Sequence, residues 1–236
     1  MNSTRVTARS IGVLYVLTML PAPLNLIYLP RRFIVPGDAT ATARNITAGE
    51  LTYRLCTLSG LVNSILFIFL VLSLYNLFKD VDRKQARLMV MLVAVSVAIA
   101  VVNLVNEIAP LILLSGADFL SVFSKPQLDA LALGFLRLRG SGVVLASAFW
   151  GLWLLPFGIL VIKSGFIPKL IGVLLIVGCF GYLAQSFTSI VLPAQVPAVF
   201  KVALPLVAPG ELFMIIWLLL KGGKVPLPEA QPGYLS

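Results

Sequence analysis

The chain contains no histidine, only two cysteines and few charged residues, which make up 11% of its 236 residues. The lack of histidine removes His-based acid–base chemistry, Ser–His nucleophilic pairs and His-ligated metals or haem. Cys56 and Cys179 both lie inside apolar segments, where a thiol behaves as a small hydrophobe, so we expect neither a disulfide framework nor a metal site. The charged fraction is far below the quarter that is typical of soluble domains. This scarcity of charge argues against a soluble globular protein.

Hydrophobic residues make up 59% of the chain and gather in long runs, for example residues 65–74, 88–102 and 212–220. A bilayer core of roughly 30 Å requires about 20 apolar residues for each helix that crosses it. At this length the chain has room for about six such helices. The composition therefore predicts an all-α, polytopic membrane bundle with about six transmembrane helices and one or two short interfacial helices, with the lipid bilayer as its main partner.

Apolar runs and turn residues place the expected spans at residues 10–29, 51–78, 88–114, 138–162, 170–192 and 199–220. Asp38 is expected to cap a short surface helix that runs through Asn45. The mildly apolar segment 117–134 predicts a second interfacial helix. We expect one transmembrane domain over residues 1–224 and a proline-rich, disordered cytoplasmic tail over residues 225–236.

Prolines mark two of these spans. Pro21 and Pro23 interrupt the first, and Pro205 and Pro209 are expected to bend the sixth. Basic residues ahead of the first span are also typical of a signal peptide. Because that run contains prolines and has no small-x-small cleavage site, we interpret it as a retained helix and keep the signal peptide as the alternative.

Basic residues predict the orientation of the chain. The net charge is +9, and most Lys and Arg residues lie at the expected helix ends. They do not form a stripe interleaved with aromatic residues, which argues against nucleic-acid binding. The short segment 79–87 carries four basic residues, and short basic loops favour the cytoplasmic side. We expect both termini to be cytoplasmic and the membrane to be the plasma membrane.

Polar residues inside the spans are the candidates for function, because an ionisable group in the bilayer is costly. Every expected span brings such a group toward the outer half, including Asn25 in the first and Gln185 in the fifth. This pattern predicts an outward-facing polar cluster that binds or transports a small or lipidic ligand, in which the acids pair with arginines or bind protons. The candidate ligand-binding set, with the surface loop included, is Glu107, Glu211, Arg54, Arg137, Arg139, Asn103, Asn106, Asp38 and Asn45.

The same residues have a structural interpretation. Glu107 and Glu211 can pair with arginines or asparagines and simply hold helices together. The protein is then a membrane scaffold or subunit with no small-molecule ligand. A third alternative is an intramembrane lipid-modifying enzyme, for which the missing histidine leaves Ser141 without a base. We therefore predict no catalytic residue and no cofactor.

Several segments carry a family resemblance. They are residues 11–15, the loop 37–46, Arg54, residues 74–77, residues 163–168 with 172–175, residues 181–183, and Glu211 followed by residues 217–222. In these segments the chain resembles the uncharacterised prokaryotic membrane family called domain of unknown function 4386, over about residues 9–222. The resemblance implies a multi-helix membrane protein and carries no established activity. It also groups the 38–45 loop, Arg54 and Glu211, since all fall in matched segments.

Overall fold

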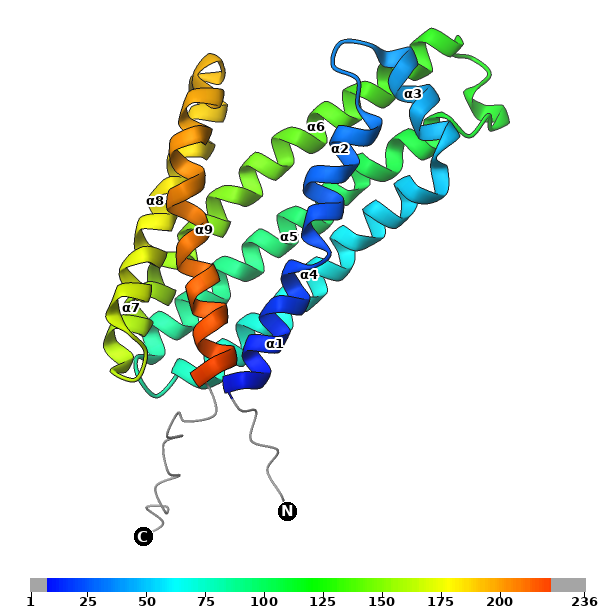
Figure 1. Ribbon diagram of the computed structural model, residues 1–236. Coiled ribbons are helices and arrows are strands. Elements are labelled where there is room, and N and C mark those ends of the chain that lie inside the picture. The colour runs from blue at the N-terminus through cyan, green and yellow to red at the C-terminus, as the bar shows by residue number, and fades with distance from the viewer. Residues whose placement is uncertain (1–7, 222–236) are drawn as a thin grey trace, which may run out of the picture.

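A computed structural model describes residues 8–221, and the predicted tail over residues 225–236 lies outside the described residues. All regular structure in the described part is helical (Figure 1). In chain order the elements are α1 (Ala8–Met19), the π-helix η1 (Leu24–Tyr28), α2 (Leu29–Phe33), α3 (Ala39–Ala48), α4 (Glu50–Phe78), α5 (Arg83–Leu113), the 3₁₀ turn η2 (Asp118–Leu120), α6 (Lys125–Leu152), α7 (Leu154–Ser164), α8 (Lys169–Val191), the 3₁₀ turn η3 (Pro193–Gln195) and α9 (Val196–Lys221).

The predicted fold class is confirmed. Five helical segments are long and apolar enough to cross a membrane, and α9 makes a sixth if its two halves count as one bent span. The bend in α9 is 41° and lies between Ala203 and Pro205. Proline cannot donate to the carbonyl four residues earlier and its ring clashes with that carbonyl, which explains the bend. The chain is a polytopic membrane protein in a lipid bilayer.

Two expected boundaries were wrong. Residues 117–134 do not form a separate interfacial helix, because α6 begins at Lys125 and runs unbroken into the fourth span. Ser124 and Gln127 form a capping box that fixes this start. The third span begins at Arg83 instead of Leu88, because the Asp82 carboxylate accepts hydrogen bonds from the amides of residues 84 and 85.

The first span is broken between α1 and η1, where Pro21 and Pro23 remove two backbone donors. The chain continues as one turn of π-helix, a conformation that is rare and often lies at functional sites. Within this turn Asn25 is buried and points into the bundle. The break therefore places a polar side chain inside the protein at the level of the membrane.

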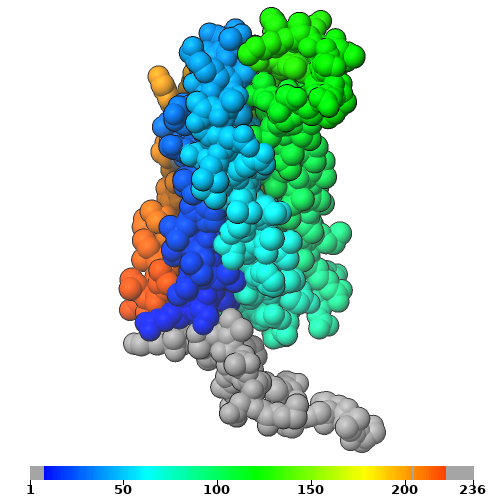
Figure 2. Space-filling model, turned by 90° about the vertical axis from the view of Figure 1, so that its right-hand side faces the viewer, coloured from blue at the N-terminus to red at the C-terminus, as the bar shows by residue number. Residues whose placement is uncertain are grey.

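The predicted cap of the surface helix is confirmed. Asp38 Oδ1 accepts a hydrogen bond of 2.8 Å from the Ala41 amide, and α3 follows directly. Helix α3 then packs against α6. Figure 2 shows these two segments side by side at the end of the molecule away from the described chain ends.

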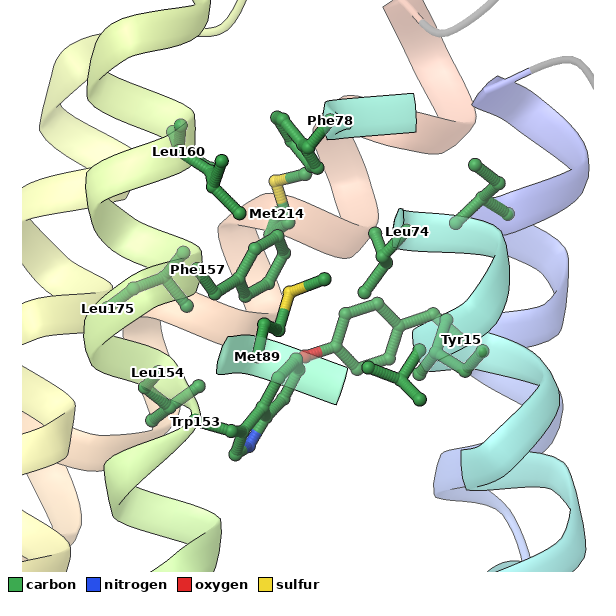
Figure 3. Packing of buried hydrophobic residues seen from close by; sticks show 14 of the residues in the cluster. Tyr15, Leu74, Phe78, Met89, Trp153, Leu154, Phe157, Leu160, Leu175 and Met214 are labelled. Carbon is green, nitrogen blue, oxygen red and sulfur yellow. The ribbon is translucent and has the colours of Figure 1, made fainter. Parts of the chain in front are cut away.

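The apolar core has two parts. The larger one surrounds Trp153 and Phe157, with Tyr15, Met89 and Met214 converging on them from α1, α5 and α9 (Figure 3). The smaller one lies toward α3 and contains Leu29, Phe33, Ile46, Tyr53, Cys56 and Leu136. Glycines let the helices approach closely, as between α7 and α8 at Gly158 and Gly172.

The described ends of the chain meet at one end of the bundle (Figure 1). Arg9 Nε donates to the Leu219 carbonyl at 3.0 Å, which links α1 to α9. At the same end Lys163, in the last turn of α7, donates to Asp82, the N-cap residue of α5, at 2.6 Å. This hydrogen bond, with a further one from the backbone of Gln85, lowers the pKa of the Asp82 carboxyl.

Close packing at Gly158 makes a testable prediction. A Cβ atom there lies 2.6 Å from the Gly172 carbonyl oxygen, so Gly158→Ala forces α7 and α8 apart and lowers the free energy of unfolding by about 1–3 kcal/mol. Gly134 has no atom within 4 Å of such a Cβ, so Gly134→Ala is the matched control and leaves stability unchanged or raised. Thermal unfolding in mild detergent measures both. Equal melting temperatures for the two variants contradict the packing argument.

Candidate functional site

Glu107 and Arg139 form a buried ion pair between α5 and α6. Arg139 Nε lies 2.7 Å from Glu107 Oε1, and the two side chains are 5% and 2% exposed. Asn25 completes the group from η1, because its amide nitrogen donates to Glu107 Oε2 at 2.8 Å. Arg139 Nη2 in turn donates to the Asn25 carbonyl at 2.6 Å and to its Oδ1 at 3.1 Å. These three residues tie the broken first span to the α5–α6 pair.

Further hydrogen bonds surround this network. Tyr53 on α4 donates its hydroxyl to the Glu107 carbonyl at 2.9 Å. Asn103 donates to the Arg139 carbonyl at 2.9 Å and accepts from Asn106 at the same distance. Asn103 and Asn106 thus pair on one face of α5.

Two glycines make room for the asparagines. A Cβ at Gly60 on α4 lies 2.9 Å from the Asn25 amide nitrogen. One at Gly142 on α6 clashes directly with the Asn103 side chain. Small residues at these positions allow polar side chains to pack against neighbouring backbones, as is common between membrane helices.

The second acid, Glu211, lies in a different environment. It is partly buried on α9 and accepts a hydrogen bond of 2.8 Å on Oε1 from the Tyr15 hydroxyl. None of the ion pairs between the described residues includes Glu211. The two acids therefore differ in kind, since one is neutralised by an arginine and the other is not.

Glu211 borders a cavity of about 510 Å³, a volume typical of small-molecule sites. The cavity lies where the first span, α4, α6, α8 and α9 meet. Its walls are mostly apolar and aromatic, and a few polar side chains from several helices, among them Asn63, Ser147 and Gln185, also line it. The lining includes Phe67, Val144, Trp150, Trp153, Tyr182, Gln185, Phe200 and Glu211.

A second, smaller cavity of about 40 Å³ borders Asn25, Asn103 and Glu107. This volume accommodates one to a few water molecules at polar groups. The two cavities share wall residues from the first span, α4 and α6, namely Ala22, Leu26, Asn63, Val143 and Trp150. The two acids thus face adjoining spaces without sharing a partner.

The remaining predicted site residues lie elsewhere. Arg54 is exposed and pairs with Glu50 one turn earlier on α4, at 2.8 Å. Arg137 is exposed, and it lies two residues from Arg139 and thus on a different face of α6. Asp38 caps α3, and Asn45 on that helix donates to the Phe33 carbonyl at 3.4 Å. The structure brings together Glu107, Arg139, Asn103 and Asn106, and separates the rest of the predicted set from them.

Sequence reasoning missed both tyrosines beside Glu211. Tyr15 and Tyr182 lie in apolar runs, where a tyrosine is more often an interfacial or packing residue. Nothing in the sequence pattern indicated that their hydroxyls lie near an acid. Among the described residues, no group of three or more Cys, Asp or Glu side chains is placed to hold a metal ion.

The buried ion pair makes the second prediction. Arg139→Met leaves Glu107 buried without a counter-charge, which lowers the free energy of unfolding by about 3–5 kcal/mol. The double variant Glu107→Met/Arg139→Met removes both charges and recovers most of this loss. The matched control is Arg54→Met, because that pair is more than half exposed and contributes about 1 kcal/mol or less. Unfolding titrations in mixed detergent micelles measure all three, and equal losses for Arg139→Met and Arg54→Met contradict the assignment.

Comparisons with known proteins give one family and no function. Neither the curated proteins nor the solved structures include a match to this chain. A family model described as domain of unknown function (DUF4386) matches residues 10–222, which is most of the chain. This agrees with the resemblance seen in the sequence. The protein therefore belongs to the DUF4386 family of proteins.

Proposed function

We propose that this protein binds a small amphipathic ligand, for storage or transport, in the 510 Å³ cavity beside Glu211. The observation that carries the proposal is the cavity itself, which combines apolar and aromatic walls with a few polar groups and one acid. Ligand sites typically combine a largely apolar surface with a few polar groups that orient the ligand. A tightly packed bundle with a purely supporting role has no need for a space of this size.

The depth of Glu211 supports an amphipathic ligand. Ten residues separate it from Lys221 at the end of α9, a rise of about 15 Å along a helix. That is about half of a typical hydrocarbon thickness. A ligand that reaches Glu211 therefore needs an apolar body that is compatible with the bilayer and a polar group to meet the acid.

The scaffold alternative is supported by a separate observation. The Glu107–Arg139–Asn25 network is closed by its own hydrogen bonds and holds three elements together. In this proposal the network is the supporting frame and the Glu211 cavity is the binding site. The two interpretations made from the sequence then apply to different parts of the same protein.

The orientation is part of the proposal. We place the end that contains Ala8 and Lys221 in the cytoplasm of the cell, because the loops and helix ends there carry Lys79, Arg83, Lys84, Arg87, Lys163 and Lys169. A fluorescent protein fused after residue 221 that folds only in the cytoplasm then emits light in cells. A fusion protein that is expressed but does not fluoresce contradicts this orientation.

Tryptophan fluorescence tests the binding cavity directly. The chain has three tryptophans, of which Trp150 and Trp153 line the cavity and Trp217 packs near Phe166. In the Trp217→Phe variant in lipid nanodiscs, a neutral spin-labelled amphiphile is expected to quench the remaining fluorescence saturably. In a Trp150→Phe/Trp153→Phe variant the same probe gives only the weak, linear quenching of a bilayer collision.

A pair of variants tests the location. Val144 lines the cavity, so Val144→Phe fills it and raises the half-saturating concentration about tenfold, since a filled site costs on the order of 1.4 kcal/mol of binding. Val173 is 47% exposed and outside the cavity, so Val173→Phe is the matched control and leaves binding unchanged. Linear quenching in the Trp217→Phe protein, or an equal response of both valine variants, rules out the proposed site.

A further inference from the structure

We infer that the ligand of this cavity is a lipophilic cation, an ammonium group on an apolar body, which Glu211 binds as its counter-ion; this inference rests on the proposed binding function. Glu211 is the one Asp, Glu, Lys or Arg side chain among the described residues that line the cavity. The chain has 18 basic residues and a net charge of +9, but no Lys or Arg in the described part of the chain lines this space. An ionised Glu211 therefore gives the cavity a charge opposite to that of the protein as a whole.

The two acids of the bundle provide an internal comparison. Glu107 has the Arg139 guanidinium at 2.7 Å and the Asn25 amide at 2.8 Å, so both of its oxygens are engaged. Glu211 has the Tyr15 hydroxyl on Oε1 and no cation among the described residues. A carboxylate in a low-dielectric site requires a counter-charge or a proton. At Glu107 the protein itself supplies the counter-charge, whereas at Glu211 the cavity has space for the cationic group of a ligand.

Aromatic side chains, in addition to the acid, favour a cationic head group in this cavity. Tyr182 lines the cavity near Glu211, and Trp150, Trp153 and Phe200 line other parts of the wall. The faces of aromatic rings attract ammonium groups, most strongly when the group has lost its water. Gln185 adds an amide oxygen that accepts a hydrogen bond from an N–H donor.

Other head groups fit this cavity less well. A phosphate or carboxylate head requires Lys, Arg or a cluster of backbone donors, and no basic residue lines the cavity within the described chain. It is also repelled by Glu211. A neutral hydroxyl head gains a hydrogen bond but leaves the acid without a counter-charge. Among heads on one apolar body, the order of affinity is therefore cationic, neutral, anionic.

A head-group series measures this order on the protein itself. Three spin-labelled amphiphiles share one alkyl chain and carry a quaternary ammonium, a hydroxyl or a sulfonate head. Each is titrated into nanodiscs of zwitterionic phosphatidylcholine that hold the Trp217→Phe protein, and quenching is plotted against the mole fraction of probe in the bilayer. The ammonium probe is expected to half-saturate at roughly one tenth of the mole fraction of the hydroxyl probe. Close charge pairs at interfaces contribute a gain in affinity of at least this size. The sulfonate probe half-saturates highest.

Glu211→Gln keeps the shape of the side chain and an oxygen that accepts from Tyr15. In this variant the ammonium and hydroxyl probes are expected to half-saturate at the same mole fraction. Glu50→Gln is the matched control, because it removes one exposed negative charge outside the cavity, and the tenfold preference remains. The head-group series on the protein that retains Glu211 is a separate test, because it does not depend on how well Glu211→Gln folds.

The outcomes separate the two proposals. Saturable quenching with equal midpoints for ammonium and hydroxyl probes overturns the cation assignment and leaves the cavity as a binding site. A preference that persists in folded Glu211→Gln also overturns it, since the acid is then not the counter-ion. Absence of saturable quenching by all three probes overturns the binding function as well.

Discussion

The bilayer supplies no water to pair polar groups, so every polar group that enters it must find a partner within the protein. In the Asn25–Glu107–Arg139 network, three buried polar side chains satisfy this requirement by pairing with one another. It joins η1 to the neighbouring helices α5 and α6, and Asn25 and Glu107 are 82 positions apart in sequence. The helices around it accommodate it with glycines at positions 60 and 142. The arrangement of the first span depends on this network, because the π-helical turn after Pro21 and Pro23 is held through Asn25.

Against this background the environment of Glu211 is unusual. Its described partner is a tyrosine hydroxyl, and it borders the 510 Å³ cavity. A polar group that is satisfied internally contributes to stability, whereas one that is left available is suited to a ligand. The division between a closed frame at Glu107 and an open acid at Glu211 is the basis of the proposed function. Residues near the bend of α9 and at the break in the first span both line that space.

Much of the fold could be predicted from the sequence, because long apolar runs and a capping aspartate are local signals. Asp38 was identified as a cap from its position ahead of a short polar helix, and the structure has that hydrogen bond. The unbroken helix α6 was not predicted, because a mildly apolar stretch followed by a strongly apolar one has the same pattern as an interfacial helix and a span. Its start had an available local signal, since Ser124 and Gln127 have the spacing of a capping box, whereas its packing against α3 is a tertiary contact.

The candidate site was predicted less completely, for a geometric reason. Arg137 and Arg139 are both near Glu107 in depth, but successive helix residues are 100° apart, so only one of them faces α5. The sequence does not show how α6 is rotated about its own axis, so it could not indicate which of the two arginines pairs with Glu107. Arg54 had an available signal, since Glu50 precedes it by four residues and such pairs form on a helix surface. Tyr15 meets Glu211 across 196 positions, and only the tertiary structure brings them together.

The contrast between a closed and an open acid is the central claim, and one chemical measurement tests it on the unmodified protein. A hydrophobic carbodiimide enters the bilayer and forms a stable adduct with carboxyl groups that it can reach, and peptide mass spectrometry locates the adduct. In nanodiscs the account predicts an adduct on Glu211 and an unmodified Glu107, since Arg139 and Asn25 enclose the latter. Equal modification of both acids, or modification of Glu107 alone, contradicts it.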